Sequence, residues 1–267
     1  MAEEVYRLER VSYRYGDVVA LRAIDLVVSV GESVAVLGAN GSGKSTLLKI
    51  LDGLYFPTSG TVSFFGRQLK KGLNPRALRE RVGFVFCEPD FQLFCQTVFD
   101  EVSFGPLQLG LPEEEVRRRA EDILSLLGLS ALRERPPYSL SSGEKKRVAI
   151  ASVLSMNPDV LLLDEPTTGL DPRTQVWLME LLIELKRLKK TSVIATHDLS
   201  LAWDVSDRAV VLNEDHGAVA DGLAPGILRD KKLLLSANLI HEHAHRHGET
   251  VHTHSHGPFS VHNEHES

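Results

Sequence analysis

The chain has 267 residues, 43% hydrophobic and 25% charged, which suffices for one globular unit with a sizeable core. Its formal net charge of −6 disfavours a nucleic-acid partner, because such proteins usually carry a basic surface. Two cysteines in this length fit a reducing compartment, not a disulfide framework. No run approaches the roughly 20 apolar residues that span a bilayer, and the N-terminus lacks the apolar core of a signal peptide. We therefore expect any membrane association to come through a partner.

The first thirty residues contain three β-rich runs, with a hairpin-like turn at Gly16-Asp17. These runs are Val5–Leu8, Val18–Leu21 and Leu26–Val30. Later apolar runs predict strands at Ser33–Leu37, Thr61–Phe65, Val82–Phe86, Val160–Leu163, Ser192–Ala195 and Ala209–Leu212. Apolar spacing predicts helices at Ser45–Asp52, Pro112–Leu127, Ser142–Met156 and Pro172–Leu188. Strands that alternate with helices indicate an α/β fold with a parallel sheet.

The composition changes at about Ile240, where apolar periodicity stops and nine of the eleven histidines follow. We predict a folded domain over 1–240 and a polar, disordered tail over 241–267. Neutral imidazole binds Ni²⁺, Co²⁺, Zn²⁺ and Cu²⁺ well, so the tail is a candidate transition-metal site, with a plain solvated tail as the alternative. The alternating histidines that would supply the ligands are His241, His243, His245, His247, His252, His254 and His256.

A glycine-rich loop lies between the strand at 33–37 and the following helix, and it matches the phosphate-loop pattern G-x-x-x-x-G-K-[ST]. Glycines let the backbone curl so that N–H groups face phosphate oxygens, and the helix adds its positive N-terminal end. Lys44 is expected to reach the β- and γ-phosphates, and the Ser45 hydroxyl to bind Mg²⁺. The residues predicted to hold the nucleotide here are Gly38, Asn40, Gly41, Ser42, Gly43, Lys44, Ser45 and Thr46.

The apolar run Val160–Leu163 ends in two carboxylates, Asp164 and Glu165. Such a strand presents its carboxyl end at the crevice where α/β folds bind ligands. Beside a phosphate loop, Asp164 is placed to hold Mg²⁺ and Glu165 to polarise the attacking water. Taken alone, the same sequence also fits a strand that ends in a solvated acidic turn.

The sequence Leu140-Ser141-Ser142-Gly143-Glu144 resembles the L-S-G-G-Q/E signature of ABC ATPases, and the resemblance covers roughly 1–230. It implies a RecA-like phosphate-loop core with a parallel sheet, an antiparallel β subdomain and an inserted α-helical subdomain at about 90–158. It also implies that Ser141, Ser142, Gly143 and Glu144 contact the γ-phosphate held by the opposite subunit. Ser142 departs from the usual glycine.

Three more positions match motifs of that family. Asp171, within Gly169-Leu170-Asp171-Pro172, resembles the loop that couples the two subunits. His197 falls where the family has a switch histidine that contacts the γ-phosphate, although a lone histidine after a strand is more often a surface residue. Tyr15 resembles the aromatic residue that stacks on adenine, with Tyr13 as the rival.

The segment after Val82–Phe86 departs from the family pattern, because Cys87 stands where a Mg²⁺-binding glutamine is usual. A thiol is a poor partner for Mg²⁺, which prefers oxygen ligands. The sequence leaves four interpretations open: Glu88 or Gln92 replaces the glutamine, water fills the gap, hydrolysis is slow, or Cys87 is a buried small residue without a role.

Residues 88–94, 97–98 and 104–112 are similar to the energy-coupling-factor branch, and closest to its cobalt and nickel uptake ATPases. The resemblance implies an ATPase that binds ATP and Mg²⁺, works as a homodimer or a paired ABC ATPase, and contacts integral-membrane transporter subunits at the cytoplasmic face of the plasma membrane. The hypothesis is import of Ni²⁺ or Co²⁺. The alternatives are an importer for zinc or a vitamin, and a soluble ABC ATPase without a transport role.

Overall fold

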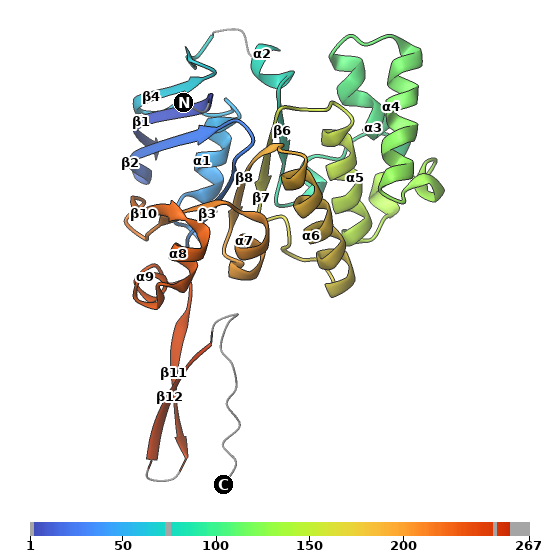
Figure 1. Ribbon diagram of the computed structural model, residues 1–267. Coiled ribbons are helices and arrows are strands. Elements are labelled where there is room, and N and C mark those ends of the chain that lie inside the picture. The colour runs from blue at the N-terminus through green and yellow to red at the C-terminus, as the bar shows by residue number, and fades with distance from the viewer. Residues whose placement is uncertain (1–2, 73–75, 248–249, 257–267) are drawn as a thin grey trace.

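The computed structural model describes residues 3–72, 76–247 and 250–256, with side chains described as far as Ile240 apart from Arg76. Within this part of the chain the strands form three sheets (Figure 1). The central sheet has the order β10-β9-β3-β8-β7-β6, and its strands run parallel except for the antiparallel edge strand β10. The bounds of these strands are β3 Ser33–Leu37, β6 Val82–Val85, β7 Val160–Asp164, β8 Thr191–Thr196, β9 Arg208–Leu212 and β10 Ala218–Leu223.

Every residue of β3, β7 and β8 is buried, as expected for parallel strands that are covered on both faces. On one face, Val34 and Val36 of β3 pack with helix α1 and the antiparallel sheet. On the other face, Ala35 and Leu37 pack with the C-terminal helices. Further along the sheet, helices α5 and α6 cover β6 and β7. The covering helices are α1 Lys44–Leu51, α5 Ser142–Leu154, α6 Pro172–Arg187, α7 Leu199–Val205, α8 Ala224–Arg229 and α9 Lys231–Ser236.

The second sheet is antiparallel and has the order β2-β1-β4-β5. Its strands are β1 Glu4–Tyr15, β2 Val18–Ser29, β4 Ser59–Phe64 and β5 Arg67–Gln68, and the four-residue helix α2 Arg76–Arg79 follows them. Tyr15 pairs with Val18, so the predicted turn at Gly16-Asp17 is confirmed. Side chains of this sheet pack with those of α1 in one core. The predicted α/β fold, with a parallel sheet, an antiparallel sheet and covering helices, is confirmed.

A helical region beside the central sheet packs α3 Val98–Gln108 and α4 Glu113–Leu126 against α5 around a core of its own. The sequence analysis did not predict α3, because Gly105 and Pro106 lie inside it. Pro106 has no N–H to donate to the Val102 carbonyl, and the buried Ser155 hydroxyl donates to that carbonyl instead, at 2.8 Å. A Cβ at Gly105 would lie 2.5 Å from the Met156 side chain, so glycine permits the close approach of α3 to the end of α5.

The third sheet is a hairpin of β11 His241–His247 and β12 Thr250–His256, which extends away from the α/β body (Figure 1). This differs from the disordered tail expected over 241–267, of which residues 248–249 and 257–267 lie outside the described part. The physical reason is the strict alternation of histidine with other residues on both sides of a two-residue connection, which is a strand and hairpin pattern. Composition alone hid this signal.

Candidate functional site

Four parallel strands deliver the predicted functional residues to one edge of the central sheet. The phosphate loop follows β3, Cys87 follows β6 by two residues, Glu165 follows β7, and His197 follows β8. Because the carboxyl ends of parallel strands meet at the same edge, residues far apart in the chain converge there. Contacts among Lys44, Ser45, Asp164, Glu165 and His197 show this convergence directly.

The phosphate loop leaves the start of α1 open to an anion. Gly41 and Gly43 have φ angles of +86° and +108°, which only glycine adopts without strain. A Cβ on Gly43 would lie 2.3 Å from the Ala20 carbonyl oxygen, so the loop has no room for a side chain there. No side chain caps α1, and the buried Ser42 hydroxyl has no hydrogen-bond partner among the described residues. These open donors fit a nucleotide phosphate.

Lys44 places a buried ammonium group inside this loop. Its Nζ donates to the carbonyl oxygens of Gly38 at 2.8 Å and Ala39 at 3.2 Å. The same atom lies 3.1 Å from Glu165 Oε1, which forms an ion pair with only 5% of the Lys44 side chain exposed. A positive charge held this rigidly can stabilise the charge on terminal phosphates.

Ser45 and Asp164 form a pair of oxygen donors beside Lys44. The Ser45 hydroxyl donates to Asp164 Oδ1 at 2.8 Å. Burial raises the pKa of Asp164, while the hydrogen bond from Ser45 opposes this rise and the neighbouring Glu165 adds to it. A hydroxyl and a carboxylate are ligands that Mg²⁺ accepts, so this pair fits the ion predicted from the sequence.

Glu165 lies between two nitrogen-bearing groups. Its Oε1 faces Lys44, and its Oε2 lies 2.9 Å from His197 Nδ1. The backbone at Glu165 has a φ of +41°, a left-handed conformation that is uncommon outside glycine. This turn directs a nearly buried carboxylate to the sheet edge, where it is able to accept a proton from water.

Tyr15 and Tyr13 differ in environment. The Tyr15 ring is 44% exposed, and its hydroxyl lies 3.2 Å from Thr46 Oγ1 at the start of α1. Tyr13 stacks on Tyr55 with ring centroids 5.2 Å apart and packs against the core. Tyr15 also meets Tyr13 and Tyr55 edge-to-face, with ring centroids 5.0 and 5.8 Å apart. Its exposure and its place beside the phosphate loop make it the candidate of the two for stacking on an adenine base.

The signature residues form a second surface that contacts α6, not the phosphate loop. A Cβ on the buried Gly143 would lie 2.8 Å from Thr174 Oγ1 and 3.3 Å from Asp171 Oδ2, so α5 and α6 meet closely here. Asp171 caps α6 and accepts from the Arg173 and Thr174 N–H groups. Among the described side chains, no hydrogen bond or ion pair joins Ser141, Ser142, Gly143, Glu144 or Asp171 to Lys44 or Ser45.

Cys87 lies near the acidic pair. Burial raises the pKa of its thiol, and Asp164 and Glu165 raise it further, whereas the ammonium of Lys146 lowers it. Gln92, one proposed substitute for the usual glutamine, donates to the Ala149 carbonyl at 2.9 Å and is thereby held against α5.

Lys146 is a residue that the sequence analysis missed. It is only 1% exposed, and its Nζ donates to the Cys87 carbonyl at 2.6 Å and to the Phe86 carbonyl at 3.2 Å. Lys146 thus connects the signature helix to the loop after β6. A lysine near the polar start of a helix gives no sequence signal that it is buried. The one available signal was its position directly after the signature sequence.

No helix in the described part is long and apolar enough to cross a membrane. Among the side chains that the structure describes, no three histidine, cysteine or acidic residues are grouped as a metal site. The histidines from 241 onward are not among them.

Sequence comparisons identify proteins that are similar to this chain. A family model described as ABC transporter matches residues 21–168. A "Putative ABC transporter ATP-binding protein" from Methanosarcina acetivorans is 50% identical over 253 residues, which is 91% of this chain and 92% of that one. The "Nickel import ATP-binding protein NikO" from Rhodobacter capsulatus is 46% identical over 243 residues, with 88% and 95% covered.

Two solved structures are also similar. The structure of cbiO1 from Clostridium perfringens, described as part of the ABC transporter complex cbiONQ, has a TM-score of 0.77 and 39% identity, and the match covers 89% of this chain and 95% of that one. A dimeric ATP-binding cassette in a post-hydrolysis state, bound to ADP and Pi, has a TM-score of 0.74 and 32% identity, with 82% and 98% covered. From the phosphate-loop geometry and these matches, the chain belongs to the ABC transporter family and is an ATP-binding ATPase subunit of it.

Proposed function

We propose that this chain is the ATP-hydrolysing subunit of a membrane importer whose substrate is Ni²⁺ or Co²⁺. The observation that carries the ATPase part is the convergence of Lys44, Asp164, Glu165 and His197 at one sheet edge. The resemblance to cobalt and nickel uptake ATPases supports the substrate, as does the 46% identity to a nickel import ATP-binding protein.

Each residue has one task in the proposed reaction. Lys44 and the open amides of the phosphate loop bind the terminal phosphates of ATP. Ser45 and Asp164 hold Mg²⁺, which neutralises phosphate charge when bound. Glu165 accepts the proton of the attacking water, and His197, 2.9 Å away, orients that carboxylate and senses the γ-phosphate.

The proposal requires two ATPase subunits. The signature residues Ser141 and Gly143 make no hydrogen bond or ion pair to Lys44 or Ser45 among the described side chains. In the proposal they cover the nucleotide of a partner subunit, a second copy or a paired ABC ATPase. The coupling loop around Asp171 packs directly against Gly143, so closure of the dimer reaches α6. ATP thereby joins two subunits, and hydrolysis separates them.

A groove beside α3 is the proposed docking site for the integral-membrane partner. It encloses about 630 Å³ and includes Phe94, Phe104 and Gly105 in its lining. Phe94 and Phe91 are 67% and 81% exposed, which is high for aromatic side chains. A transmembrane subunit that docks a helix here would hold the chain at the cytoplasmic face of the plasma membrane.

The tail histidines listed above complete the proposal as a transition-metal site. Several imidazoles on one short segment suit capture of Ni²⁺ or Co²⁺ on the cytoplasmic side. They are not needed for the ATPase chemistry.

Glu165→Gln tests the reaction. The amide cannot take a proton, so the variant is expected to bind ATP, hydrolyse it at least about 100-fold more slowly and accumulate as a closed dimer. Size-exclusion chromatography with and without MgATP measures the dimer, and phosphate release measures the rate. Glu184→Gln, an exposed glutamate of α6 paired with Arg187, is the matched control. Undiminished turnover in Glu165→Gln would contradict the role of that carboxylate.

Transport tests the substrate. The chain is co-purified with its integral-membrane partners, reconstituted into vesicles with ATP on the ATPase side, and supplied with radiolabelled Ni²⁺, Co²⁺ or Zn²⁺. We expect ATP-dependent uptake of Ni²⁺ or Co²⁺ that is absent with Glu165→Gln. Uptake of neither ion, in vesicles that hydrolyse ATP, contradicts the proposed substrate while leaving the ATPase intact.

A further inference from the structure

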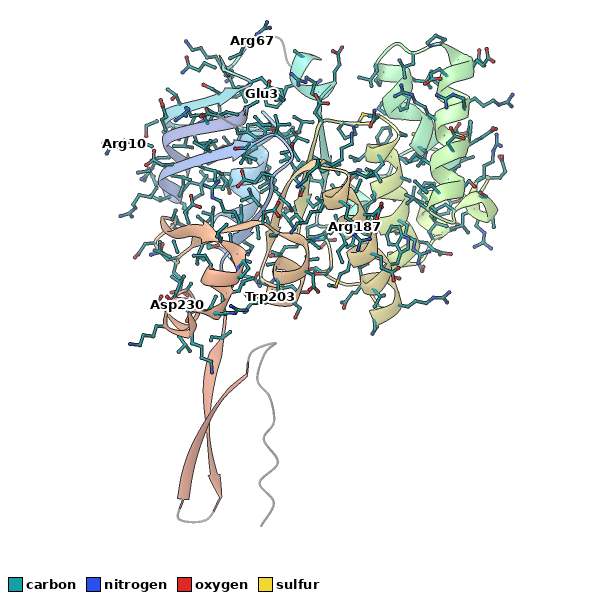
Figure 2. All side chains as sticks on the ribbon, viewed as in Figure 1. Glu3, Arg10, Arg67, Arg187, Trp203 and Asp230 are labelled. Atoms are coloured by element: carbon teal, nitrogen blue, oxygen red, sulfur yellow. The ribbon has the colours of Figure 1, made fainter. Side chains whose placement is uncertain are left out.

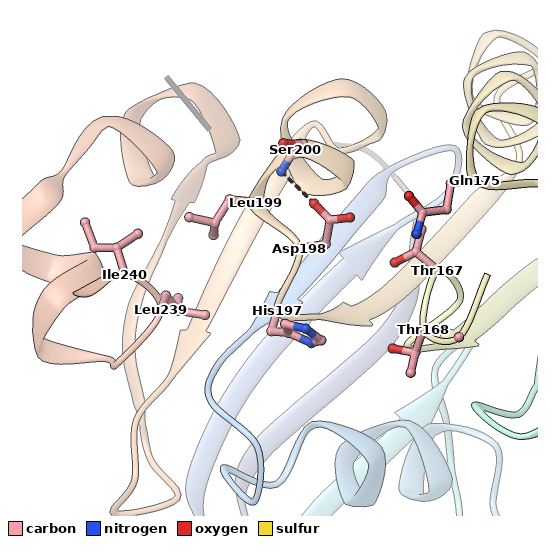
Figure 3. A pocket seen from close by; sticks show the side chains of 10 residues that line it. Thr167, Thr168, Gln175, His197, Asp198, Leu199, Ser200, Leu239 and Ile240 are labelled. Atoms are coloured by element: carbon pink, nitrogen blue, oxygen red, sulfur yellow. Dashed lines mark hydrogen bonds between the residues drawn. The ribbon is translucent and has the colours of Figure 1, made fainter. Parts of the chain in front are cut away.

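A cavity beside the nucleotide site connects it to the C-terminal segment. The cavity measures about 510 Å³, and its walls come from four parts of the chain: 167–169, Gln175 of α6, 197–200 and Leu239–Ile240. Figure 3 shows His197 between Leu239 on one side and Thr168 on the other. The wall at 167–169 begins two residues after Glu165 and the wall at 197–200 begins at His197, so the C-terminal segment shares a cavity with both parts of the hydrolytic site.

The root of the hairpin is fixed to this wall. Ile240 is 7% exposed and packs in one core cluster with Leu199, which is 5% exposed. Asp198 accepts from the Ser200 and Leu201 N–H groups at 2.9 and 3.1 Å and starts α7 immediately after His197. Strand β11 begins at the next residue after Ile240. One peptide bond therefore separates the hairpin from Ile240, which packs with Leu199 and lines the same cavity as His197.

Neighbouring aromatic packing holds the same region. Arg229 lies over the Trp203 ring with its Cζ 5.1 Å from the ring centroid, which ties α8 to α7. Figure 2 places Trp203 and Asp230 at the side of the body from which the hairpin leaves. A change in the rigidity of the hairpin at Ile240 would therefore act on the packed helices α7 and α8.

The hairpin register gathers the tail histidines. Three cross-strand pairs are His241 with His256, His243 with His254, and His245 with His252. Residues two apart on a strand, and residues directly opposite on its neighbour, share one face of the sheet. His247 falls at the same parity, so seven histidine positions lie on one face of the hairpin. A two-stranded hairpin alone is marginally stable in water, and a shared metal ion would stabilise it.

We infer that this face binds a divalent cation with a preference for imidazole, such as Ni²⁺, and that metal binding slows the ATPase through Ile240. The ion rigidifies the hairpin, the rigid hairpin restrains the Leu239–Ile240 wall, and the wall limits the movement of His197 and of the segment after Glu165 during the cycle. This inference rests on the proposed function. If the chain drives Ni²⁺ or Co²⁺ import, imported metal that binds the hairpin would slow further import.

Three full-length proteins test it: the unchanged chain, a variant with the seven register histidines replaced by glutamine, and a variant with Gly-Ser-Gly-Ser inserted between Ile240 and His241. Equilibrium dialysis with free Ni²⁺ set by a competing chelator measures metal binding. Phosphate release and ATP affinity, both with Mg²⁺ in large excess, measure the response. The glutamine variant controls for any nickel that competes at the Mg²⁺ site.

We expect the unchanged chain to bind Ni²⁺ at least about tenfold more tightly than the glutamine variant, and its hydrolysis rate to fall at least about twofold on loading. The insertion variant should bind Ni²⁺ normally and lose the response. The inference is overturned if the unchanged chain binds Ni²⁺ no more tightly than the glutamine variant, if its hydrolysis rate does not fall on loading, or if the rate of the insertion variant falls equally. Failure to bind ATP without nickel would instead contradict the proposed function itself.

Discussion

The phosphate loop and the signature sequence each form the start of a helix. The two starts differ in whether side chains bond to their backbone N–H groups. Helix α1 begins after Gly43 with no capping side chain and no acidic residue in its first turn. Helix α5 begins with a complete capping box, in which Ser141 accepts from the Glu144 N–H and the Glu144 carboxylate accepts from the Ser141 N–H and hydroxyl. The start of α1 has no capping side chain, whereas the start of α5 has its Ser141 and Glu144 N–H groups already bonded to side chains.

This difference predicts a division of labour. An isolated chain should bind ATP through α1 alone, because the donors there need no rearrangement. The start of α5 must exchange its capping contacts for those of a phosphate, which gives a weaker and later interaction that depends on a partner. Hydrogen bonds from Ser141 hold the pKa of Glu144 below its usual value, so this carboxylate stays charged and the exchange is not a matter of protonation near neutral pH.

The largest effect is expected for Lys44→Ala. Loss of the only ammonium within reach of the described loop carbonyls also leaves Glu165 without that ion pair. ATP affinity of the isolated chain should fall at least about 100-fold, measured by calorimetric titration. Lys186→Ala, which removes a lysine paired with Asp207 at 3.1 Å, should leave affinity unchanged. Equal ATP affinity of Lys44→Ala and the unchanged chain would refute the assignment of α1 as the primary site.

Gly143→Ala tests the signature side. The added methyl group would meet Thr174 Oγ1 at 2.8 Å, so α5 and α6 must shift apart. ATP binding to the monomer should be unchanged, while ATP-dependent dimerisation and hydrolysis fall roughly 30-fold, equivalent to about 2 kcal/mol of strain. Analytical ultracentrifugation measures the dimer. The control is Gly226→Ala, whose methyl group would enter open space. A similar loss of ATP affinity in the monomer would contradict the proposal that the isolated chain binds ATP through α1 alone.

Asp52→Asn tests how the stability of the chain depends on pH through the end of α1. Burial at the end of α1 raises the pKa of Asp52 to about 7. A carboxyl group whose pKa is raised on folding contributes stability at low pH, and that contribution is lost as pH rises from about 4 to about 7. The variant should therefore match the unchanged chain near pH 4 and exceed its unfolding free energy by about 2 kcal/mol at pH 8, measured by urea denaturation. A constant difference across this range would mean that Asp52 is ionised throughout.

The smallest effect is expected for Ser142→Gly, which restores the residue that is usual in the family. Ser142 is exposed, and exposed substitutions change free energy by about 0.5 kcal/mol or less. Hydrolysis by the dimer should change by no more than about twofold to threefold. A change above tenfold in the rate would instead identify the Ser142 hydroxyl as a direct contact of the nucleotide.

The sequence predicted best those parts of the molecule where an apolar run is followed by a residue type that the ATPase chemistry requires. Three strand ends, those of β3, β7 and β8, were predicted because an apolar run stops at or near a glycine, an acid or a histidine. Helix α3 was missed because the solution to its internal Pro106 lies on another helix, at Ser155. Lys146 was missed for a similar reason, since its partners are carbonyl groups that carry no sequence identity. Long-range pairings of this kind are visible only in three dimensions.

The left-handed backbone at Glu165 has a consequence for which side chains can replace it. A β-branched residue such as valine or threonine fits poorly at positive φ, whereas asparagine, aspartate and glycine are tolerated. Relatives that have lost hydrolysis should therefore carry a short polar residue or glycine at this position more often than a bulky aliphatic one. In such relatives the left-handed backbone conformation would be retained although the catalytic carboxylate is lost.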